Sequence, residues 1–256
     1  SAQTVTVTGA DDNVIDGTIT STINVAINDA NSNDSFDGVV DQTVSITTTD
    51  NDVAGFTITQ SGGSTSVNES GTTDTFTVVL NAQPNEGVTF TAASSDTGEA
   101  TIAPASLSFT AANWNTPQTL TVTGVDDNII DGTQTSTTTL SILDAITDDA
   151  FDGVVDQTVS VTTVDNDVAG FTIVQSGGST SVNESGTTDT FTVVLDAEPT
   201  SSVVLTISSS DSGEATSTSL ITFTTGNWNT AQTVTVTGVD DNLIDGTITS
   251  TLTIAV

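Results

Sequence analysis

The chain has 256 residues and a formal net charge of −33, because it contains 33 Asp and Glu residues and no Lys, Arg or His. Binding to nucleic acid or insertion at an anionic membrane surface is not expected, since both depend on basic side chains. Without Cys, the chain has no disulfide framework, no thiolate nucleophile and no zinc–thiolate site. An apolar fraction of 34% is still enough for folded domains, so packing, bound cations or both must hold the fold together.

Seven segments in the middle of the chain alternate apolar residues with Thr or Ser, the period of two that is typical of half-buried β-strands. Gly, Asn, Asp and Pro separate them, and no segment has helical periodicity. The predicted strands are residues 55–60, 74–80, 87–92, 106–110, 118–124, 135–142 and 157–164. This pattern predicts an all-β fold of tandem immunoglobulin-like antiparallel β-sandwiches, with about seven strands each and no helices.

The same sequence recurs along the chain. "DNDVAGFTI" begins at Asp50 and again at Asp165, 115 residues later. "SGGSTSVNESGTTDTFTVVL" begins at Ser61 and again at Ser176, with the same offset. Only "DNDVAG" connects one repeat to the next, which is too short for a flexible linker. We therefore expect neighbouring repeats to be sandwiches placed end to end, like beads rather than the coils of a solenoid.

The offset divides the chain into three parts. Residues 1–53 are the C-terminal part of one repeat, 54–168 are a complete repeat, and 169–256 are a third repeat that lacks its last strand. Residues 2–27 correspond to 231–256, so the ends overlap. Two interpretations fit this overlap: a window on a longer array, or a subunit whose incomplete ends complete one another between neighbouring molecules.

The acidic residues of the complete repeat gather in four of its loops. These loops carry Glu69; Asp96 and Glu99; Asp126, Asp127 and Asp131; and Asp165 and Asp167. Carboxylates that converge without a counter-charge repel one another and raise one another's pKa values. Ligand sets made only of oxygen favour a hard cation, and Ca²⁺ suits loop carboxylates and main-chain carbonyls better than Mg²⁺ does. The alternative is that Asp, Asn and Gly are simply good turn residues, but their recurrence in register favours calcium.

The complete repeat resembles the Calx-beta family. The resemblance lies in the order "VNESG", "TFTVVL", "SSDTGEAT", "TVTGVDDNIIDGT" and a closing "VDND", and repetition extends it over nearly the whole chain. It implies a calcium-binding β-sandwich whose ligands lie at the end next to the following domain. In the complete repeat the positions that match the family's ligands are Glu69, Asp96, Asp126, Asp127, Ile129 (through its carbonyl), Asp131, Asp165 and Asp167.

The other two copies carry the same pattern in part. The corresponding positions are Asp11, Asp12, Val14, Asp16, Asp50 and Asp52 in the first copy, and Glu184, Asp211, Asp240, Asp241, Leu243 and Asp245 in the third. The chain departs from the family at Asn128 and Asn166, where all-acidic members have Asp, and at 132–134, where further acids are often found. These departures imply fewer ions at each junction, or weaker binding.

The sequence favours a structural function over a catalytic one. General acid–base and nucleophilic sites lack most of their usual residues, because the chain has no His, Cys, Lys, Arg or Tyr. A paired-carboxylate glycosidase is formally possible, but its acids should not recur in successive domains. We expect a calcium-stiffened shaft of a large extracellular bacterial adhesin or surface filament. Its partners would be neighbouring repeats of the same chain and other copies in a filament or bundle.

Two other functions stay open. One is a recognition module that binds carbohydrate or protein through its loops, since one loop differs between copies: "NDANSNDS" at 28–35 and "LDAITDDA" at 143–150. The other, with less support, is calcium signalling.

Overall fold

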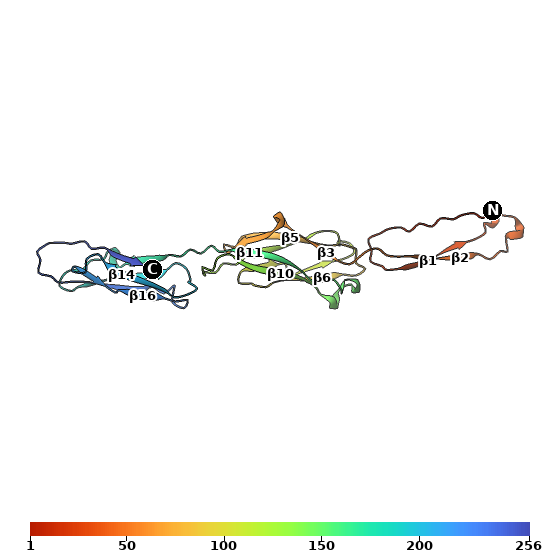
Figure 1. Ribbon diagram of the computed structural model, residues 1–256. Coiled ribbons are helices and arrows are strands. Elements are labelled where there is room, and N and C mark those ends of the chain that lie inside the picture. Colours follow the sequence, from red (N-terminus) through yellow and green to blue (C-terminus); the bar gives the residue numbers. More distant parts are fainter. The chain divides into compact units, whose positions relative to one another are not determined.

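The computed structural model describes residues 1–256 and confirms the all-β fold. The strands are β1 (Ile19–Val25), β2 (Gln42–Thr48), β3 (Phe56–Gln60), β4 (Thr65–Asn68), β5 (Thr73–Leu80), β6 (Val88–Ser94), β7 (Ala100–Ala103), β8 (Ser106–Phe109), β9 (Gln118–Gly124), β10 (Gln134–Ile142), β11 (Gln157–Val164), β12 (Phe171–Gln175), β13 (Thr188–Leu195), β14 (Val203–Ser209), β15 (Ala215–Ser217), β16 (Leu220–Phe223), β17 (Gln232–Gly238) and β18 (Leu252–Ala255). All seven segments predicted in the complete repeat are strands, and β4 and β7 are two short additional ones (Figure 1).

The helical content consists of three-residue 3-10 turns in the loops. They are η1 (Asp29–Asn31), η2 (Asp34–Phe36), η3 (Ser61–Gly63), η4 (Asp144–Ile146), η5 (Asp149–Phe151) and η6 (Ser176–Gly178). Asn33 and Asp148 begin η2 and η5 by accepting a main-chain N–H two residues further on, a common role of Asn and Asp in turns. No helix of the chain has the length and apolar character needed to cross a membrane.

The complete repeat is a sandwich of two sheets with the strand orders β4-β11-β10-β6-β8 and β3-β5-β9-β7. Alternation places one face of each strand inside: Phe76, Val78 and Leu80 of β5 are buried, and the residues between them are half-buried. Phe90 lies at the centre of this core, edge-to-face with Phe56 at 4.8 Å and with Phe109 at 5.9 Å between ring centroids. Such a dry apolar core is the main source of stability in a chain without ion pairs.

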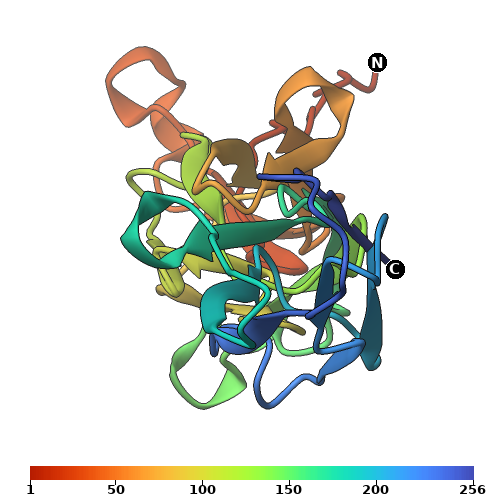
Figure 2. The same cartoon turned by 90° about the vertical axis from the view of Figure 1, so that its left-hand side faces the viewer.

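The third repeat has the same four-stranded sheet as the complete repeat, and residues 169–256 form three strands of the other sheet. Its sheets have the orders β12-β13-β17-β15 and β16-β14-β18, and they are the teal and blue arrows of Figure 2. Its core contains Phe191, Leu205, Phe223 and Val234, each at most 5% exposed. Residues 180–183, the counterpart of β4, form no strand, and β18 pairs with β14 alone.

Packing divides the chain into two compact units that do not coincide with the sequence repeats. The first comprises residues 1–67, 73–123 and 135–161, and the second comprises 68–72, 124–134 and 162–256. The loops after β4, β9 and β11 therefore belong to the same unit as the third repeat. In the first unit, residues 1–18 contain only an isolated bridge at Val14, and β1 pairs with β2 over seven residue pairs.

Candidate metal centre

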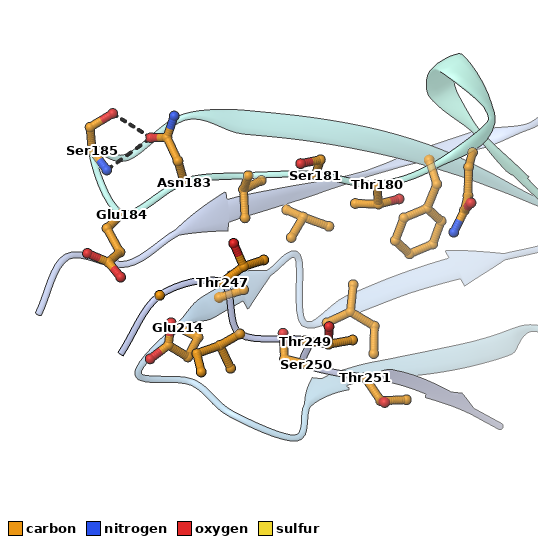
Figure 3. A pocket seen from close by; sticks show the side chains of 18 of the residues that line it. Thr180, Ser181, Asn183, Glu184, Ser185, Glu214, Thr247, Thr249, Ser250 and Thr251 are labelled. Atoms are coloured by element: carbon orange, nitrogen blue, oxygen red, sulfur yellow. Dashed lines mark hydrogen bonds between the residues drawn. The ribbon is translucent and has the colours of Figure 1, made fainter. Parts of the chain in front are cut away.

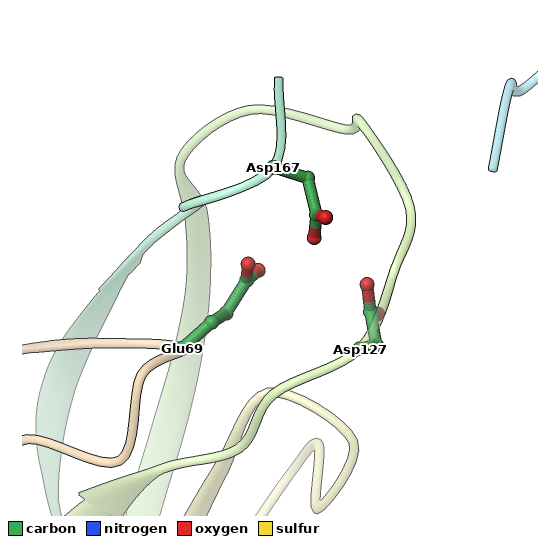
Figure 4. Close-up of side chains that lie close together, drawn as sticks. All are labelled: Glu69, Asp127 and Asp167. Atoms are coloured by element: carbon green, nitrogen blue, oxygen red, sulfur yellow. The ribbon is translucent and has the colours of Figure 1, made fainter. Parts of the chain in front are cut away.

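Three acidic side chains meet at the ends of three strands. Glu69 follows β4, Asp127 follows β9 and Asp167 follows β11, and Figure 4 shows their carboxylates turned toward one another. One oxygen of each lies within 4.8 Å of the other two. β4 and β11 are neighbours in one sheet, and the Glu69 N–H donates to the Val164 carbonyl at 3.2 Å. The pairing of β4 with β11 therefore brings Glu69 close to Asp165 and Asp167, which were predicted to belong to the same centre.

Glu69 is a buried carboxylate with one of its two oxygens lacking a hydrogen-bond partner. It is 1% exposed. Its Oε2 accepts the Asn166 N–H at 3.1 Å, whereas its Oε1 has no partner. Oδ2 of Asp167 is likewise buried without a partner. A buried polar atom without a hydrogen bond is costly and rare, and a buried charge normally has a counter-ion or a metal.

The surroundings of Glu69 and Asp167 oppose their ionisation. Burial raises the pKa of Glu69, and the nearby carboxylates of Asp165, Asp127 and Asp131 raise it further. Burial also raises the pKa of Asp167, followed by repulsion from the carboxylates around it. Because no basic side chain exists to balance these groups, a bound cation is the remaining way to hold them ionised together. The donor set, carboxylates aimed at a common point, fits such an ion.

Asp165 fastens the loops of the centre to each other. Its Oδ1 accepts the Asp167 N–H at 2.6 Å and its Oδ2 accepts the Gly132 N–H at 2.8 Å. These main-chain hydrogen bonds lower the pKa of Asp165, so it stays ionised. The first copy repeats this arrangement, since Asp50 accepts the N–H groups of Asp52 and Gly17 at 2.8 Å each. Asp50 and Asp165 thus each link their own loop to the turn at Gly17 or Gly132, which follows the acidic stretch.

Asn166 is a component of the centre that the sequence analysis treated only as a departure from the family. Its main-chain N–H reaches Glu69, and its Nδ2 donates to Asp126 Oδ1 at 3.0 Å. An amide at this position supplies a hydrogen-bond donor to a carboxylate, which an Asp could not do when ionised. The signal was present in the sequence, because "DND" recurs unchanged at 50–52 and 165–167.

The remaining predicted ligands of the complete repeat differ in how close they lie to Glu69. Asp131 is exposed, but one of its carboxylate oxygens lies within 4.8 Å of one of Glu69. Its N–H donates to the Ile129 carbonyl at 3.0 Å, so this oxygen already has one partner. Asp127 Oδ1 accepts the Ile129 N–H at 2.7 Å, which fixes the loop shape. Asp96 lies in the other compact unit, where its Oδ1 accepts the Gly98 N–H at 3.0 Å in a local turn.

The third repeat has an acidic cluster of its own. Oxygens of Glu214, Asp241 and Asp245 lie within 4.8 Å of one another. Glu214 was not among the predicted ligands, although its "SGEA" sequence repeats the "TGEA" around Glu99. Burial, followed by repulsion from Asp245 and Asp241, raises the pKa of Glu214. Its predicted neighbour Asp211 is exposed and accepts the Gly213 N–H at 3.0 Å.

Other predicted positions of the outer copies stay at the surface. Glu184 is half-buried, whereas its counterpart Glu69 is fully buried. Asp240 and Leu243 are exposed, and the Leu243 N–H donates to Asp241 Oδ1 at 2.6 Å. In the first copy Asp11, Asp12 and Asp16 are exposed, and Asp12 Oδ1 accepts the Val14 N–H at 2.9 Å. Asp52 is half-buried, and burial, followed by repulsion from Asp50, raises its pKa.

The acidic loop also pairs with the following repeat. Asn128 accepts the Glu198 N–H at 2.6 Å, and the Ile130 N–H donates to the Glu198 carbonyl at 3.2 Å, which makes a parallel bridge between Ile129 and Glu198. The first unit contains the same motif. The Gln83 N–H donates to the Asn13 carbonyl at 2.7 Å, and the Ile15 N–H donates to the Gln83 carbonyl at 3.2 Å. The acidic loop that carries Asn128 is therefore also the connection of one repeat to the loop after β5 or β13 of the next.

No protein-family model matches the chain, and no curated relative matches it. Solved structures similar to it include the apo-form Calx CBD1 domain, at 16% identity over 44% of this chain and 98% of that one, with a TM-score of 0.33. A second is CBD12 from CALX1.2, at 14% identity over 77% and 79% of the two chains, with a TM-score of 0.32. A third is domains 1–6 of the surface layer protein SbsC, at 17% identity over 93% of this chain and 29% of that one, with a TM-score of 0.35.

Proposed function

We propose that this chain is a structural calcium-binding repeat array, the extended and calcium-stiffened shaft of a large extracellular bacterial adhesin or surface filament. Its role is mechanical rather than enzymatic. The observation that carries the proposal is the buried Glu69 carboxylate, which has an unpartnered Oε1 and faces Asp127 and Asp167. Together these three would hold the ion, with Asp165 and Asn166 keeping the loops in place.

Calcium suits this centre better than other common metals. The ligands are oxygens alone, which disfavours zinc and copper, and they come from three separate loops, which suits the loose coordination of Ca²⁺ better than the strict octahedron of Mg²⁺. The bound ion would replace repulsion among the carboxylates by attraction. It would thereby join β4, β9 and β11 at one end of the sandwich.

Stiffness follows from the second use of the same loop. Residues 128–130, which directly follow the proposed ligand Asp127 in the chain, pair with Glu198 of the following repeat. Without the ion, like charges closer than the Debye length of about 8 Å would repel one another and loosen this loop. With it, the loop is fixed, and so is its pairing to the next repeat.

The test is small-angle X-ray scattering of the full chain in calcium, in magnesium and in chelator. We expect a longer maximum dimension and a narrower length distribution in calcium than in chelator, with little restoration by magnesium. The D126N/D127N variant should behave in calcium as the parent chain does in chelator. Equal length distributions in calcium and chelator would show that the metal does not stiffen the chain, and the recognition function would then be favoured.

A further inference from the structure

The two ends of a repeat carry different chemistry. Figure 3 shows Glu184 and Glu214 at one end of the third repeat, where they line the same open groove. β13 runs from this end to the other, and the loop that follows it receives the acidic loop of the complete repeat at Glu198. Each junction thus joins the acidic end of one repeat to a receiving loop of the next.

At the first junction an apolar side chain crosses from one repeat to the next. Ile15 belongs to "DDNVIDG" of the first copy, but it is half-buried against the apolar core of the complete repeat. Its N–H donates to the Gln83 carbonyl at 3.2 Å, and its carbonyl accepts Asn85 Nδ2 at 2.6 Å. The Gln83 N–H also donates to the Asn13 carbonyl at 2.7 Å. Three hydrogen bonds therefore hold Ile15 against a sandwich to which it does not belong.

A buried carboxylate fastens the receiving loop to its own sandwich. Asp148 is 6% exposed, and its Oδ2 accepts the Asn85 and Glu86 N–H groups at 2.7 and 2.9 Å. Its Oδ1 accepts the Ala150 N–H at 3.0 Å. Burial opposes the ionisation of Asp148, but these main-chain hydrogen bonds outweigh it and lower its pKa. The contacts of Ile15 thus extend through the receiving loop to the turn before β11.

The second junction repeats the arrangement. Ile130 stands at the same place in "DDNIIDG" and is half-buried, and its N–H donates to the Glu198 carbonyl at 3.2 Å. The position before it is Val14, Ile129 or Leu243 in the three copies, whereas this position is Ile in all three. The residue that docks on the next repeat is therefore the one that does not vary along the chain.

We propose that Ile15 and Ile130, the docking isoleucines, couple the folding of neighbouring repeats. Each contributes apolar packing to the following sandwich, so a repeat opens more easily once the repeat before it has unfolded. The coupling is reciprocal, because the free energy of one contact stabilises both partners. The stability of the array then has a contribution from every junction as well as from every repeat, and the repeats do not unfold as independent beads.

One consequence rests on the proposed calcium centre. Asp127 precedes Ile130 by three residues, so an ion held by Asp127 would also fix the docking isoleucine of the second junction. Calcium bound by the complete repeat should then protect residues 196–202 of the third repeat, the receiving loop, which contains none of the proposed ligands.

The first experiment measures hydrogen exchange of the full chain in chelator by mass spectrometry, so that no metal is involved. I15N should speed exchange about tenfold in peptides from 81–87 and 143–150, which belong to another repeat than the substitution. I15V keeps an apolar side chain and should change these peptides little. V40N is a similar polar change at a residue of the first copy that is 77% exposed, and it should leave them unchanged.

A variant of the receiving loop tests the coupling from the other side, with the first copy unmodified. N85T introduces the residue that the third repeat has at this place, Thr200, and removes the hydrogen bond to the Ile15 carbonyl. Exchange in peptides from 11–18 should become faster. Faster exchange of I15N confined to residues 1–53, or no change of 11–18 in N85T, would overturn the proposal.

The second experiment compares exchange in calcium and in chelator. In the parent chain calcium should slow exchange at 68–72 and, to a smaller extent, at 196–202. I130N should lose the effect at 196–202 and keep it at 68–72. Protection of 68–72 alone in the parent chain would exclude transmission to the third repeat while the calcium centre stands. Protection at neither place would contradict the calcium centre, whereas the coupling itself is decided in chelator by I15N and N85T.

Discussion

The complete and third repeats carry nearly the same acidic loops but differ in how deeply they bury them. Glu69 is 1% exposed because β11 pairs beside it and Asn166 covers its carboxylate. Glu184, in the same "VNES" sequence, lacks these neighbours and is half-buried, and Glu214 joins Asp241 and Asp245 instead. The closing strand β11, rather than the acidic loop, therefore creates a buried carboxylate with an unpartnered oxygen.

The comparison predicts that calcium stabilises the complete repeat more than the third. A site occupied at one hundred times its Kd adds roughly 2.7 kcal/mol, which slows hydrogen exchange through global opening by about a hundredfold. Hydrogen-exchange mass spectrometry of the full chain should show this protection in peptides from β4, β9 and β11. Peptides from β13 and β17 should change less. Equal protection in both repeats would mean that the buried Glu69 is not what selects the ion.

Removal of two charges from the loop should abolish most calcium binding. D126N/D127N keeps the size of both side chains while it removes a member of the cluster and its neighbour. D29N/D34N makes the same chemical change in the loop that differs between copies and should have little effect. Isothermal titration calorimetry on both variants measures the difference, and equal losses would show that the ligands are misassigned.

E69Q should have opposite effects with and without calcium. In chelator it should stabilise the fold, because it removes a buried charge whose ionisation is opposed by burial and by nearby carboxylates. In calcium it should destabilise the fold, because a charged ligand is lost. E184Q, at the half-buried counterpart, should change the unfolding temperature less, both in chelator and in calcium. Thermal unfolding of the two variants tests this, and stabilisation of E69Q in both conditions would exclude Glu69 as a ligand.

The smallest expected effect is on the pH dependence. The folded-state pKa values of Glu69 and Asp167 are raised, so without metal these groups destabilise the fold at neutral pH. Acidification through the raised pKa values toward the ordinary 4.5 of Glu should therefore increase metal-free stability. Asp165 acts in the opposite direction, and its contribution is lost only as the pH falls below the ordinary 3.8 of Asp.

Two controls isolate this effect from the general relief of charge repulsion on acidification. E69Q should flatten the increase in metal-free stability above pH 4.5. In calcium the trend should reverse, because the ligands must be deprotonated to bind. Denaturant unfolding at each pH provides the measurement, and identical slopes for E69Q and the parent chain would contradict it.

The octapeptide "AQTVTVTG" shows where prediction from sequence ends. At 231–238 it contains β17, with Val234 0% and Val236 3% exposed. At 2–9 it forms no strand, and Val5 and Val7 are 79% and 50% exposed. Alternation predicts which face of a strand is apolar, but a strand also needs a neighbour to satisfy its backbone, and residues 2–9 have none.

Within the complete repeat the sequence predicted the long strands and the grouping of Glu69, Asp127 and Asp167. It missed β4 and β7, because β4 contains only one apolar residue, Val67, and β7 is mostly Ala and Thr, which have little strand signal. It also missed the role of Glu198, which acts through its main-chain N–H and carbonyl, groups that carry no sequence signal. The contact of the Asn166 N–H with Glu69 is hidden for the same reason, whereas the Asn166 side chain in the repeated "DND" was a signal that could have been used. The ligand roles of Asp96, Ile129 and Asp131 stay predictions.

The bridge between the acidic loop and the following repeat has a consequence for how such a gene can change. Each complete copy carries both halves of the contact, "DDNI" at 126–129 and the Gln83 or Glu198 loop that receives the preceding copy. Unequal exchange between copies in register therefore alters their number while every new neighbour still finds its partner. A deletion inside one copy would instead remove a half-contact and expose an unpaired backbone at that point. Selection should thus tolerate alleles that differ by whole multiples of the repeat and remove those of intermediate length.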